Sequence, residues 1–556
     1  MKKPWLSTYP DGVPENIDAG SYSSLIDVFE QSFKKFSDRP AFCNFGKSLN
    51  YAELDRYTKD LAAYLQVKLK MKKGDKIAIM MPNLLQNPVS ILGALRAGLT
   101  VVNTNPLYTA DELKYQLNDS GASTIIILEN FAHVLEQVVS ETSIKHVIIT
   151  RMADMIPFPK SMIINAVVKH IKKMVPAFSI ANAINFKQAL TAGHQCEYSR
   201  PDTQLEDYAF LQYTGGTTGV AKAAILTHGN MIANLQQVTP WIDHITTEGE
   251  EIIITALPLY HIFSLLANCF VFMKIGALNF LITNPRDMKG FVKELKTVKF
   301  TAITGVNTLF NGLLNTPGFS ELDFSRLKLT LGGGMAVQKA VADKWQQVTG
   351  HPLLEAYGLT ETSPAVCICP MNLKSYNGKI GLPLPSTDVS IQNDKNELLP
   401  TGEPGEICIR GPQVTQGYYR HPEETAIAFD DDGWFHSGDI GFMDEQGYFE
   451  IVDRKKDMIL VSGFNVYPNE VEAVIASHPD VLEVGVIGLP DEQCGEIVMA
   501  VIVSSNPELN TEDIQNYCNE RLTRYKIPKR VEFVSEVPKT NVGKILRRKL
   551  RDQFIS

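Results

Sequence analysis

The sequence lacks the cysteine spacing of a metal-binding or disulfide-rich protein. Its eight cysteines are scattered over 556 residues, and only Cys367 and Cys369 lie close together. No CxxC pair or Cys/His spacing typical of a zinc site occurs. We therefore expect a reduced, cytoplasmic protein.

An excess of positive charge is also missing. The formal net charge of -9 argues against nucleic acid as a partner. The basic start has no apolar core or small-residue cleavage site, so it does not predict a secretory signal. Internal repeats and low-complexity tracts are absent, and the 44% hydrophobic content suits a globular chain of two or more domains.

One stretch without Asp, Glu, Lys or Arg, residues 252–273, is long enough to cross a bilayer. Pro258, His261 and Asn268 interrupt it. We interpret it as a buried strand at 252–256, a loop and a buried helix, and not as a membrane span.

From residue 76 the pattern alternates between strand and helix, which is typical of a parallel sheet with crossover helices. The expected strands are 77–81, 100–102, 124–128, 146–149, 300–304 and 327–331, and the expected helices are 86–97, 111–119 and 337–348. The last of these strands runs into Gly332, Gly333 and Gly334. Open α/β sheets bind ligands at such strand ends.

After about residue 378 the pattern changes to shorter strands and Gly/Asp turns. Strand-like pieces lie at 406–410, 433–435 and 447–452, and a charged break follows at 453–457. A compact α+β pattern follows, with helices at 468–477 and 511–524 and strands at 484–487, 497–503 and 531–534. We expect an α/β fold with a large N-terminal domain, residues 1–453, that includes a β-rich part, and a small α+β C-terminal domain, residues 454–556.

Residues 161–175 are amphipathic at helical spacing. The apolar side holds Ile163, Ile164, Val167, Val168, Ile171, Met174 and Val175, and the other side holds Asn165, Lys169, Lys172 and Lys173. The pattern fits a basic helix that rests on an anionic membrane surface. It equally fits a surface helix that covers a core.

A glycine- and threonine-rich loop at 212–222 has the composition of a polyphosphate site. Gly215, Gly216 and Gly219 permit amide groups to converge on an anion, and hydroxyls of Thr214, Thr217 and Thr218 and the ammonium of Lys222 add to them. The loop is not a Walker A motif, because Lys222 lies three residues beyond Gly219 and precedes Ala223. Taken alone, it could also be a flexible turn.

Five further stretches accompany this loop. They are Leu257-Pro258-Leu259-Tyr260-His261, Tyr357-Gly358-Leu359-Thr360-Glu361-Thr362, the run from Asp432 to Ile440, Val452-Asp453-Arg454-Lys455-Lys456-Asp457 and Pro538-Lys539-Thr540-Asn541-Val542-Gly543-Lys544. Their order and separation resemble the adenylate-forming superfamily of acyl-CoA synthetases, luciferases and adenylation domains. Residues 432–456 look like the fatty-acyl-CoA synthetase signature, with Ser437 where threonine is usual. The closest resemblance is to bacterial long-chain fatty-acid–CoA ligases.

The resemblance implies a reaction in which a fatty acid and ATP form an acyl-adenylate, and CoA then displaces AMP. Alternatives are a medium-chain or aryl acid–CoA ligase, a ligase that transfers the acyl group to a carrier protein, and a non-catalytic acyl-binding protein. Expected partners are fatty acid, ATP and CoA, with Mg²⁺ as cofactor; peripheral contact with an anionic membrane and a homodimer stay open.

The resemblance also assigns site residues. ATP and AMP would contact Tyr213, Thr214, Gly215, Gly216, Thr217, Thr218, Gly219, Lys222, Gly333, Gly334, Tyr357, Thr360, Asp439 and Arg454. Catalysis would depend on Lys544, His261, Thr360 and Glu361, magnesium on Glu361 and Thr214, and CoA on Ser462 and Gly463, with a hinge near Lys456. Without the resemblance, Lys544 would be a solvated residue of a basic tail, His261 a core histidine and Glu361 a carboxylate at a helix start.

Overall fold

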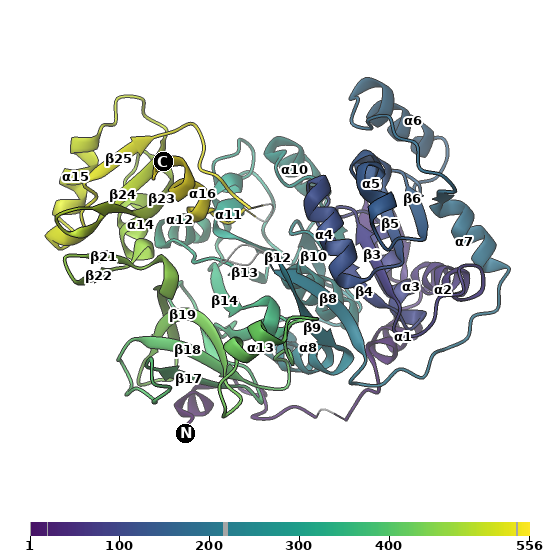
Figure 1. The fold of residues 1–556 in the computed structure, drawn as a ribbon, viewed down its shortest axis with the longest axis horizontal. Coiled ribbons are helices and arrows are strands. Elements are labelled where there is room, and N and C mark those ends of the chain that lie inside the picture. Colours follow the sequence, from purple (N-terminus) through teal and green to yellow (C-terminus); the bar gives the residue numbers. More distant parts are fainter. Residues whose placement is uncertain (1, 19, 215–220, 541–542, 556) are drawn as a thin grey trace.

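In the described part of the chain the strands form four β-sheets, three in the large N-terminal part and one in the C-terminal part (Figure 1). The structure is a computed structural model, and it describes residues 2–18, 20–214, 221–540 and 543–555. The α/β fold predicted from the sequence, with a large N-terminal and a small C-terminal domain, is confirmed.

The first sheet contains the parallel strands expected from residue 76 onward. In spatial order its strands are β7 (Ile184–Asn185), β6 (His146–Thr150), β5 (Thr124–Leu128), β3 (Lys76–Met80), β4 (Thr100–Asn103), β8 (Tyr208–Thr214) and β9 (Lys222–Thr227). All neighbours are parallel except β8 and β9. Every residue of β5 is buried, as expected for a parallel strand covered on both faces. The helices along residues 51–194 include α2 (Tyr51–Val67), α3 (Gln86–Arg96), α4 (Ala110–Ser120), α5 (Ala132–Val138) and α7 (Phe186–His194). Helices α3 and α7 contact strands of this sheet.

The second sheet is larger and has a parallel centre with antiparallel edges. Its order is β16 (Leu382–Pro383), β15 (Ala365–Ile368), β14 (Leu354–Gly358), β13 (Leu329–Gly333), β12 (Ala302–Gly305), β10 (Ile252–Thr255), β11 (Leu278–Leu281), β1 (Pro40–Asn44) and β2 (Lys47–Asn50). Strands β12 and β13 begin two residues later than the predicted strands 300–304 and 327–331, because pairing with the neighbouring strands begins at Ala302 and Leu329. The other helices of the N-terminal part include α1 (Leu25–Lys35), α8 (His228–Asp243), α9 (Val271–Lys274), α10 (Met288–Leu295), α11 (Asn307–Leu314) and α12 (Lys339–Thr349). Helix α9 contacts β11 of this sheet, whereas α8 contacts β8 and β9 of the first sheet.

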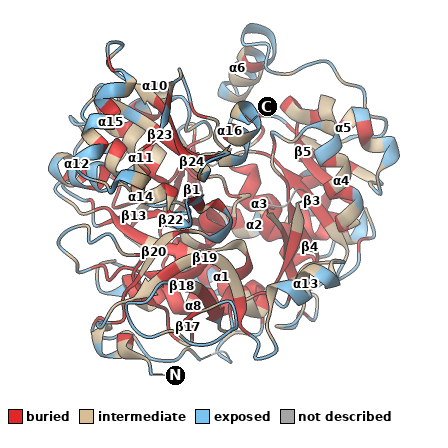
Figure 2. Ribbon diagram, turned by 60° about the vertical axis from the view of Figure 1, so that its left-hand side comes forward, coloured by how far each residue is buried: buried red, intermediate tan, exposed pale blue. Residues whose placement is uncertain are grey.

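The two sheets share one hydrophobic core, which includes Ile77 and Val101 of the first sheet and Ile253 and Leu331 of the second. Figure 2 shows β3 and β4 among the buried parts of the molecule. Residues 252–273 form β10, a π-helical turn η5 (Ser264–Phe270) and α9, as interpreted from the sequence. Among the described residues, every helix is too short or too polar to cross a bilayer.

The third sheet is the β-rich part, and it is antiparallel throughout. Its strands are β17 (Asp388–Gln392), β18 (Gly405–Arg410), β19 (Phe435–Met443) and β20 (Phe449–Arg454), with α13 (Pro422–Ala428) beside them. The predicted strand at 433–435 is wrong in extent, because the chain becomes extended only at Phe435 and then continues to Met443. Strand β20 includes Asp453 and Arg454, which pair with β19, so the chain leaves the sheet within the predicted charged break at 453–457.

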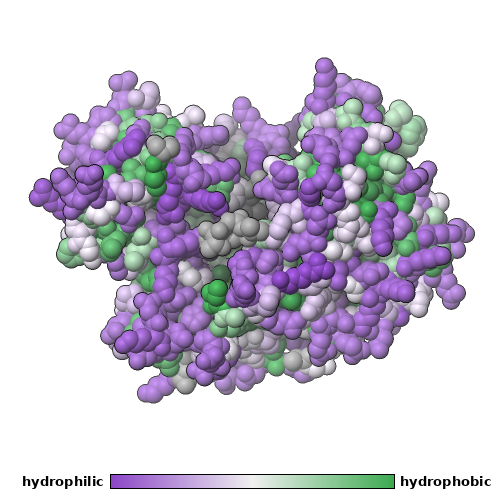
Figure 3. All heavy atoms as spheres, viewed as in Figure 1, coloured by the Kyte–Doolittle hydropathy of each residue, from purple (hydrophilic) through white to green (hydrophobic). Residues whose placement is uncertain are grey.

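The C-terminal part has its own five-stranded sheet and core. It contains β22 (Phe464–Val466), β21 (Ile459–Val461), β24 (Gly495–Ser504), β23 (Val481–Asp491) and β25 (Arg530–Phe533), with α14 (Pro468–Ala476), α15 (Thr511–Asn519) and α16 (Arg547–Phe554). The predicted helix 511–524 ends at Asn519, one residue after its last buried side chain, Cys518. Figure 3 shows a hollow between this domain, at left, and the rest of the molecule.

The amphipathic segment forms an arm that projects at one end of the first sheet (Figures 1 and 2). We call α6 (Lys160–Ala166) and the π-helical turn η4 (Val167–Ile171) the α6 arm. The prediction of a helix to 175 is wrong for its last residues, because Lys173 has a left-handed φ of 51°. The predicted apolar face divides: Ile164, Val168 and Val175 pack on the core, Val167 is half-buried, and Ile163, Ile171 and Met174 are exposed. Met162, outside that predicted face, is exposed as well.

Candidate active site

Three predicted nucleotide-binding residues form a hydrogen-bonded group. Tyr357, from β14, donates its hydroxyl to Asp439 Oδ2 at 2.7 Å, and Arg454 Nε lies 3.0 Å from Asp439 Oδ1. Asp439 and Arg454 face each other across the β19–β20 pair. Burial raises the pKa of Tyr357, and the Asp439 carboxylate raises it further. The third sheet therefore presents an aspartate and an arginine to the carboxyl end of β14.

Lys544 reaches this group from the C-terminal domain. A Cβ at Gly334, just beyond β13, would lie 3.2 Å from Lys544 Cε. Thr308 of α11 donates its hydroxyl to the Gly543 carbonyl at 3.0 Å. Gly543 has a φ of 86°, which favours glycine, and a Cβ there would lie 2.6 Å from Thr308 Oγ1. The close approach of Thr308 therefore favours glycine immediately before the lysine.

The electrostatic surroundings of Lys544 come from several motifs. Its pKa is lowered to about 8, chiefly because burial disfavours the ammonium. The positive charge of Arg454 lowers the pKa as well, whereas the carboxylates of Asp439 and Glu361 raise it. The structure thus brings together one cation and two carboxylates around the side chain predicted to act in adenylation.

His261 lies in the same region and is neutral near pH 7. Its pKa is lowered to about 3, first by burial and then by the charge of Lys544. The imidazole Nδ1 accepts the Phe263 N–H at 3.4 Å. The proton of the neutral ring is therefore assigned to Nε2, which is left as a hydrogen-bond donor.

Glu361 is a buried carboxylate beside the end of the Gly/Thr loop. It lies in the short turn η6 (Thr360–Thr362), which packs against β8 and β9, and Thr360 is half-buried next to it. Tyr418 donates its hydroxyl to Glu361 Oε1 at 2.8 Å. Burial raises the pKa of Glu361. A nearby cation would therefore stabilise the carboxylate form.

The described ends of the Gly/Thr loop are held by β8 and β9. Thr214 and Lys222 face each other in this pair. Lys222 Nζ lies 3.6 Å from Glu424 and 5.6 Å from the centre of the Tyr418 ring. Gly215, Gly216, Thr217, Thr218 and Gly219, all predicted to contact phosphates, lie outside the described residues.

Tyr213 differs from the other predicted ATP contacts. Its hydroxyl donates to Asp119 Oδ2 of α4 at 2.6 Å, so the side chain is directed toward α4. Gly333 ends β13, and a Cβ there would lie 3.0 Å from the Phe263 ring. Packing against Phe263 thus gives Gly333 a structural reason to be glycine.

The predicted CoA residues lie elsewhere on the C-terminal domain. Ser462 and Gly463 form the two-residue turn between β21 and β22, with φ values of 52° and 84°. Both are exposed, and a Cβ at Gly463 would meet no atom within 4 Å. Lys456 is exposed in the turn η7 (Lys455–Asp457), which connects the third sheet to this domain.

Sequence reasoning missed several residues that support the site. Tyr418 connects Glu361 and Lys222, Thr308 holds Gly543, and Gln212 donates to the Tyr260 carbonyl at 2.6 Å beside His261. Gln212 stood inside the quoted loop motif and could have been found there. Tyr418 and Thr308 belong to no motif, because only the three-dimensional packing brings them to the site.

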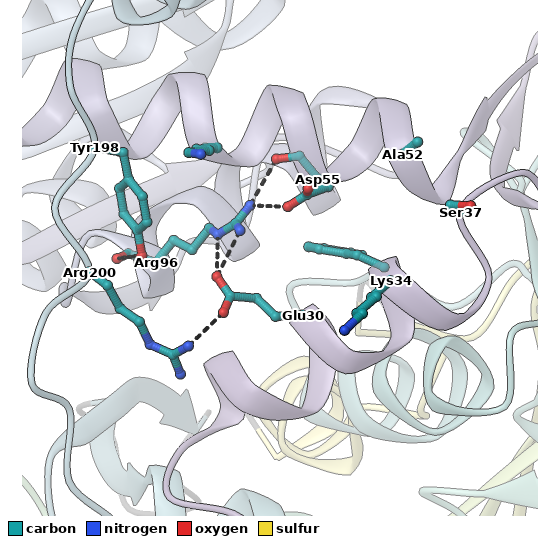
Figure 4. A pocket seen from close by; sticks show the side chains of 10 residues that line it. Glu30, Lys34, Ser37, Ala52, Asp55, Arg96, Tyr198 and Arg200 are labelled. Atoms are coloured by element: carbon teal, nitrogen blue, oxygen red, sulfur yellow. Dashed lines mark hydrogen bonds and ion pairs between the residues drawn. The ribbon is translucent and has the colours of Figure 1, made fainter.

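A separate depression of about 550 Å³ contains none of the predicted site residues (Figure 4). Within it, Arg96 bonds Glu30 at 2.7 Å and Asp55 at 2.6 Å, and Arg200 bonds Glu30 at 2.8 Å. Each of these guanidinium groups is already neutralised by carboxylates. The ion pairs connect α1, α2 and α3. We therefore interpret the depression as part of the helix packing and not as a binding site.

Comparison with known proteins identifies the class to which this fold and site belong. The AMP-binding enzyme family matches residues 29–419, and the AMP-binding enzyme C-terminal domain matches residues 470–544. The chain belongs to the AMP-binding enzyme family. The resemblance to the adenylate-forming superfamily found in the motifs is confirmed.

Individual relatives are similar over their whole lengths. A long-chain-fatty-acid–CoA ligase of Escherichia coli O6:H1 is 54% identical over 553 residues, which cover 100% of this chain and 98% of the relative. The ATP-bound MatB of Rhodopseudomonas palustris is 26% identical, with a TM-score of 0.80 and coverage of 96% and 99%. An anthranilate CoA ligase, AuaEII, in complex with anthranoyl-AMP shares the fold with a TM-score of 0.85 at 22% identity, over 100% and 99% of the two chains.

Proposed function

We propose that the chain is an ATP-dependent long-chain fatty acid–CoA ligase, which releases AMP and diphosphate through an acyl-adenylate. The observation that carries the proposal is the position of Lys544, which the C-terminal domain places against Gly334 and within electrostatic reach of Asp439, Arg454 and Glu361. The 54% identity to a long-chain-fatty-acid–CoA ligase supports the choice of substrate.

The first half-reaction brings two negatively charged groups together, so it needs cations between them. A carboxylate is a poor acylating agent, and its attack on the α-phosphate of ATP brings two anions together. In the proposal, Lys544 bridges the attacking carboxylate and the α-phosphate, so that its charge stabilises the transition state. Neutral His261 lies beside them, and its Nε2–H donates to the acyl carboxylate or the phosphate without adding a charge.

The Tyr357–Asp439–Arg454 group fits a nucleoside. In the proposal, Asp439 accepts from the ribose hydroxyls and Arg454 donates to the same sugar, while the Tyr357 ring and the backbone at Gly333 and Gly334 border the adenine. Fixing Asp439 with Tyr357 and Arg454 before ATP arrives reduces the entropy lost on binding.

The residues beside the loop fit a magnesium ion that takes most of its ligands from phosphate and water. Glu361 offers a buried carboxylate as a metal ligand, and Thr214 is the last residue of β8 nearby. In the described part of the chain no three acidic, His or Cys side chains gather as a metal cage. Magnesium, when bound, would neutralise phosphate charge; Thr214, Lys222 and the loop between them would hold the β- and γ-phosphates.

In the second half-reaction the CoA thiol must reach the acyl carbonyl, so a group other than Lys544 must lie beside it. We propose that the C-terminal domain rotates about a hinge near Lys456, which withdraws Lys544 and brings the Ser462–Gly463 turn to the site. The open space around Gly463 supports this, because a pantetheine chain could pass close to its backbone.

A direct assay tests the proposed function. The purified enzyme with magnesium, ATP and palmitate should release pyrophosphate and form palmitoyl-AMP, and CoA should then discharge it to palmitoyl-CoA. Rates over fatty acids of increasing length separate long-chain from medium-chain and aryl substrates. A carrier-protein ligase would form the adenylate but leave free CoA unacylated, and a non-catalytic binding protein would release no pyrophosphate.

We also propose that the α6 arm makes peripheral contact with an anionic membrane. Met162, Ile163, Ile171 and Met174 are exposed, and Phe158 before the arm is 78% exposed. Figure 3 shows hydrophobic surface at this end of the molecule, at upper right. Lys160, Lys169, Lys172 and Lys173 add positive charge along the same segment. Co-sedimentation with anionic vesicles, with and without residues 161–175, tests the contact.

A further inference from the structure

A second cavity lies at the base of the α6 arm and is separate from the candidate active site. It measures about 430 Å³ and is lined by Glu129, Arg151, Asp154, Asn165, Lys169 and Lys187, among others. Glu129 and Arg151 directly follow β5 and β6, which are parallel neighbours in the first sheet. The cavity is thus at the carboxyl edge of a parallel sheet, where such sheets bind ligands.

The cavity combines two buried carboxylates with three exposed cations. The Glu129 and Asp154 residues are 5% and 8% exposed, whereas Arg151, Lys169 and Lys187 are exposed. Asp154 accepts from the Arg151 N–H at 2.8 Å and from the Thr150 hydroxyl at 3.2 Å. The ligand chemistry must therefore satisfy negative charge inside and positive charge at the rim.

Glu129 is poorly satisfied for a buried carboxylate. Its nearest cation, Arg151 Nε, lies 3.8 Å away, which is too long for a hydrogen bond. Burial raises the pKa of Glu129. Among the residues with described positions, the ammonium groups of Lys169 and Lys187 take part in no ion pair within 4.0 Å. This differs from the depression around Arg96, where each guanidinium is paired.

We propose that this cavity binds the zwitterionic headgroup of an ethanolamine phospholipid. The ammonium would donate hydrogen bonds to Glu129, and the phosphate would lie among Arg151, Lys169 and Lys187. The exposed apolar side chains of the α6 arm, including Ile163 and Ile171, would contact the acyl region of the same membrane. The inference rests on the proposed membrane contact and adds a specific headgroup to it.

The charges distinguish this headgroup from two similar ones. A purely anionic headgroup would pair with the rim cations but leave the buried Glu129 carboxylate without a donor, which is unfavourable. A choline headgroup carries the same charges as ethanolamine, but its trimethylated nitrogen has no N–H to donate. Ethanolamine and choline lipids therefore form a matched pair for the test.

The experiment measures binding of the full-length protein to vesicles with a fixed anionic fraction, in which the remaining lipid is either phosphatidylethanolamine or phosphatidylcholine. We expect at least threefold tighter binding with ethanolamine. Glu129→Gln should remove this preference and leave the binding to choline vesicles unchanged. Lys172→Gln is the matched control on the α6 arm, because Lys172 does not line the cavity; it should weaken binding to both vesicles alike.

Soluble headgroups separate the inference from the proposals on which it rests. Titration calorimetry with glycerophosphoethanolamine and glycerophosphocholine should show binding of the first alone, weakened by Glu129→Gln and by Lys187→Gln. Ligase activity on micellar palmitate should match the wild type in both variants, which shows that they fold. Equal binding of the two headgroups, or a vesicle preference that survives Glu129→Gln, would overturn the headgroup site and leave the ligase proposal untouched.

Discussion

At the scale of single residues, Lys544 connects the two domains chemically. Its ammonium comes from the C-terminal domain, whereas Arg454, Asp439 and Glu361, which all act on its pKa, lie on β20, β19 and η6. The side chain can therefore matter for one half-reaction and be dispensable in the other, provided that the domain moves between them.

Lys544→Ala should reduce acyl-AMP formation by about 100-fold or more, which is the usual cost of losing one positioned group that stabilises transition-state charge. Conversion of supplied palmitoyl-AMP to palmitoyl-CoA should stay within about threefold of the wild type, since the lysine is predicted to act only in adenylation. Single-turnover assays of the two half-reactions measure both rates. Equal losses in both would contradict the assignment.

The low pKa of Lys544 makes adenylation sensitive to alkaline pH. The ammonium form carries the charge, and a pKa lowered to about 8 means that the charge is lost as the pH rises through 8. We expect kcat/KM for ATP in the adenylation half-reaction to be level below pH 8 and to fall above it, because this parameter reports the free enzyme.

Lys544→Arg is the control for this pH profile. A guanidinium keeps its charge throughout the range, so the fall above pH 8 should disappear even if the absolute rate is lower. Persistence of the same alkaline limb in the arginine variant would assign it to another group. His261, with a pKa of about 3, is already neutral across the range.

At the scale of elements, the proposed mechanism uses two segments of the C-terminal domain, the β21–β22 turn and the segment that ends at Lys544. Ser462 and Gly463 both have positive φ, and the two-residue loop matches the right-handed twist of its strands. Thr540 donates its backbone N–H to the Lys544 carbonyl at 2.7 Å and accepts the Lys544 N–H on its hydroxyl at 3.0 Å. The two segments are separate parts of one domain, so we propose that one replaces the other by rotation of the whole domain.

Gly463→Leu should spare adenylation and reduce the thioester half-reaction by about 100-fold, because the side chain would fill the space proposed for pantetheine. Gly402→Leu is a matched control in the third sheet's region, since Gly402 also has a positive φ of 86° and open space around its Cβ position. The same backbone strain there should lower stability without separating the half-reactions. The prediction fails if Gly463→Leu and Gly402→Leu give the same kinetic pattern.

The sequence predicts some elements more accurately than others. Strand β5 was predicted at its observed bounds, because a run of isoleucines buried on both faces leaves little ambiguity. The end of the α6 arm was predicted wrongly, since its periodicity continues to Val175 while the backbone turns at Lys173. Local pattern fixes which faces are apolar; whether a neighbour covers them depends on tertiary packing.

The same limit applies to the site. Asp439 and Arg454 could be predicted from their motifs, and the structure pairs them across β19 and β20. Tyr418 could not, because its contact with Glu361 joins residues 57 positions apart and outside any motif. The sequence also gives no sign that Tyr213 is held by Asp119.

At the scale of the whole molecule, a buried ion network crosses the expected domain boundary. Asp453 pairs with Ile440 through its backbone in the third sheet. Its carboxylate accepts the Asn469 N–H at 2.7 Å and lies 3.1 Å from Arg547, both in the C-terminal domain. Arg547 also bonds Glu472 at 2.8 Å. Rotation about Lys456 would separate Asp453 from Arg547, so this network stabilises the orientation in which Lys544 is at the site.

Locking that orientation tests the domain rotation directly. A Cβ at Gly543 would lie 3.9 Å from the Cβ of Thr308, within the range of about 3.5–4.5 Å found in disulfides. The double variant Thr308→Cys/Gly543→Cys, when oxidised, should therefore fix Lys544 in the adenylation position. We expect it to form palmitoyl-AMP but to convert it to palmitoyl-CoA about 100-fold more slowly than the wild type.

Reduction of the disulfide provides the internal control for the lock. Dithiothreitol should restore the thioester half-reaction in the double variant, and the two single variants should not respond to oxidation in this way. Of the native cysteines, Cys196 and Cys494 are half-buried and the other six are buried. Peptide mapping therefore has to distinguish the engineered pair from disulfides of Cys196 and Cys494. If the oxidised double variant, with its disulfide verified, makes palmitoyl-CoA at the wild-type rate, both half-reactions occur in one orientation and the rotation is not required. Loss of both half-reactions on oxidation, with recovery of both on reduction, would show instead that adenylation itself needs freedom at Gly543.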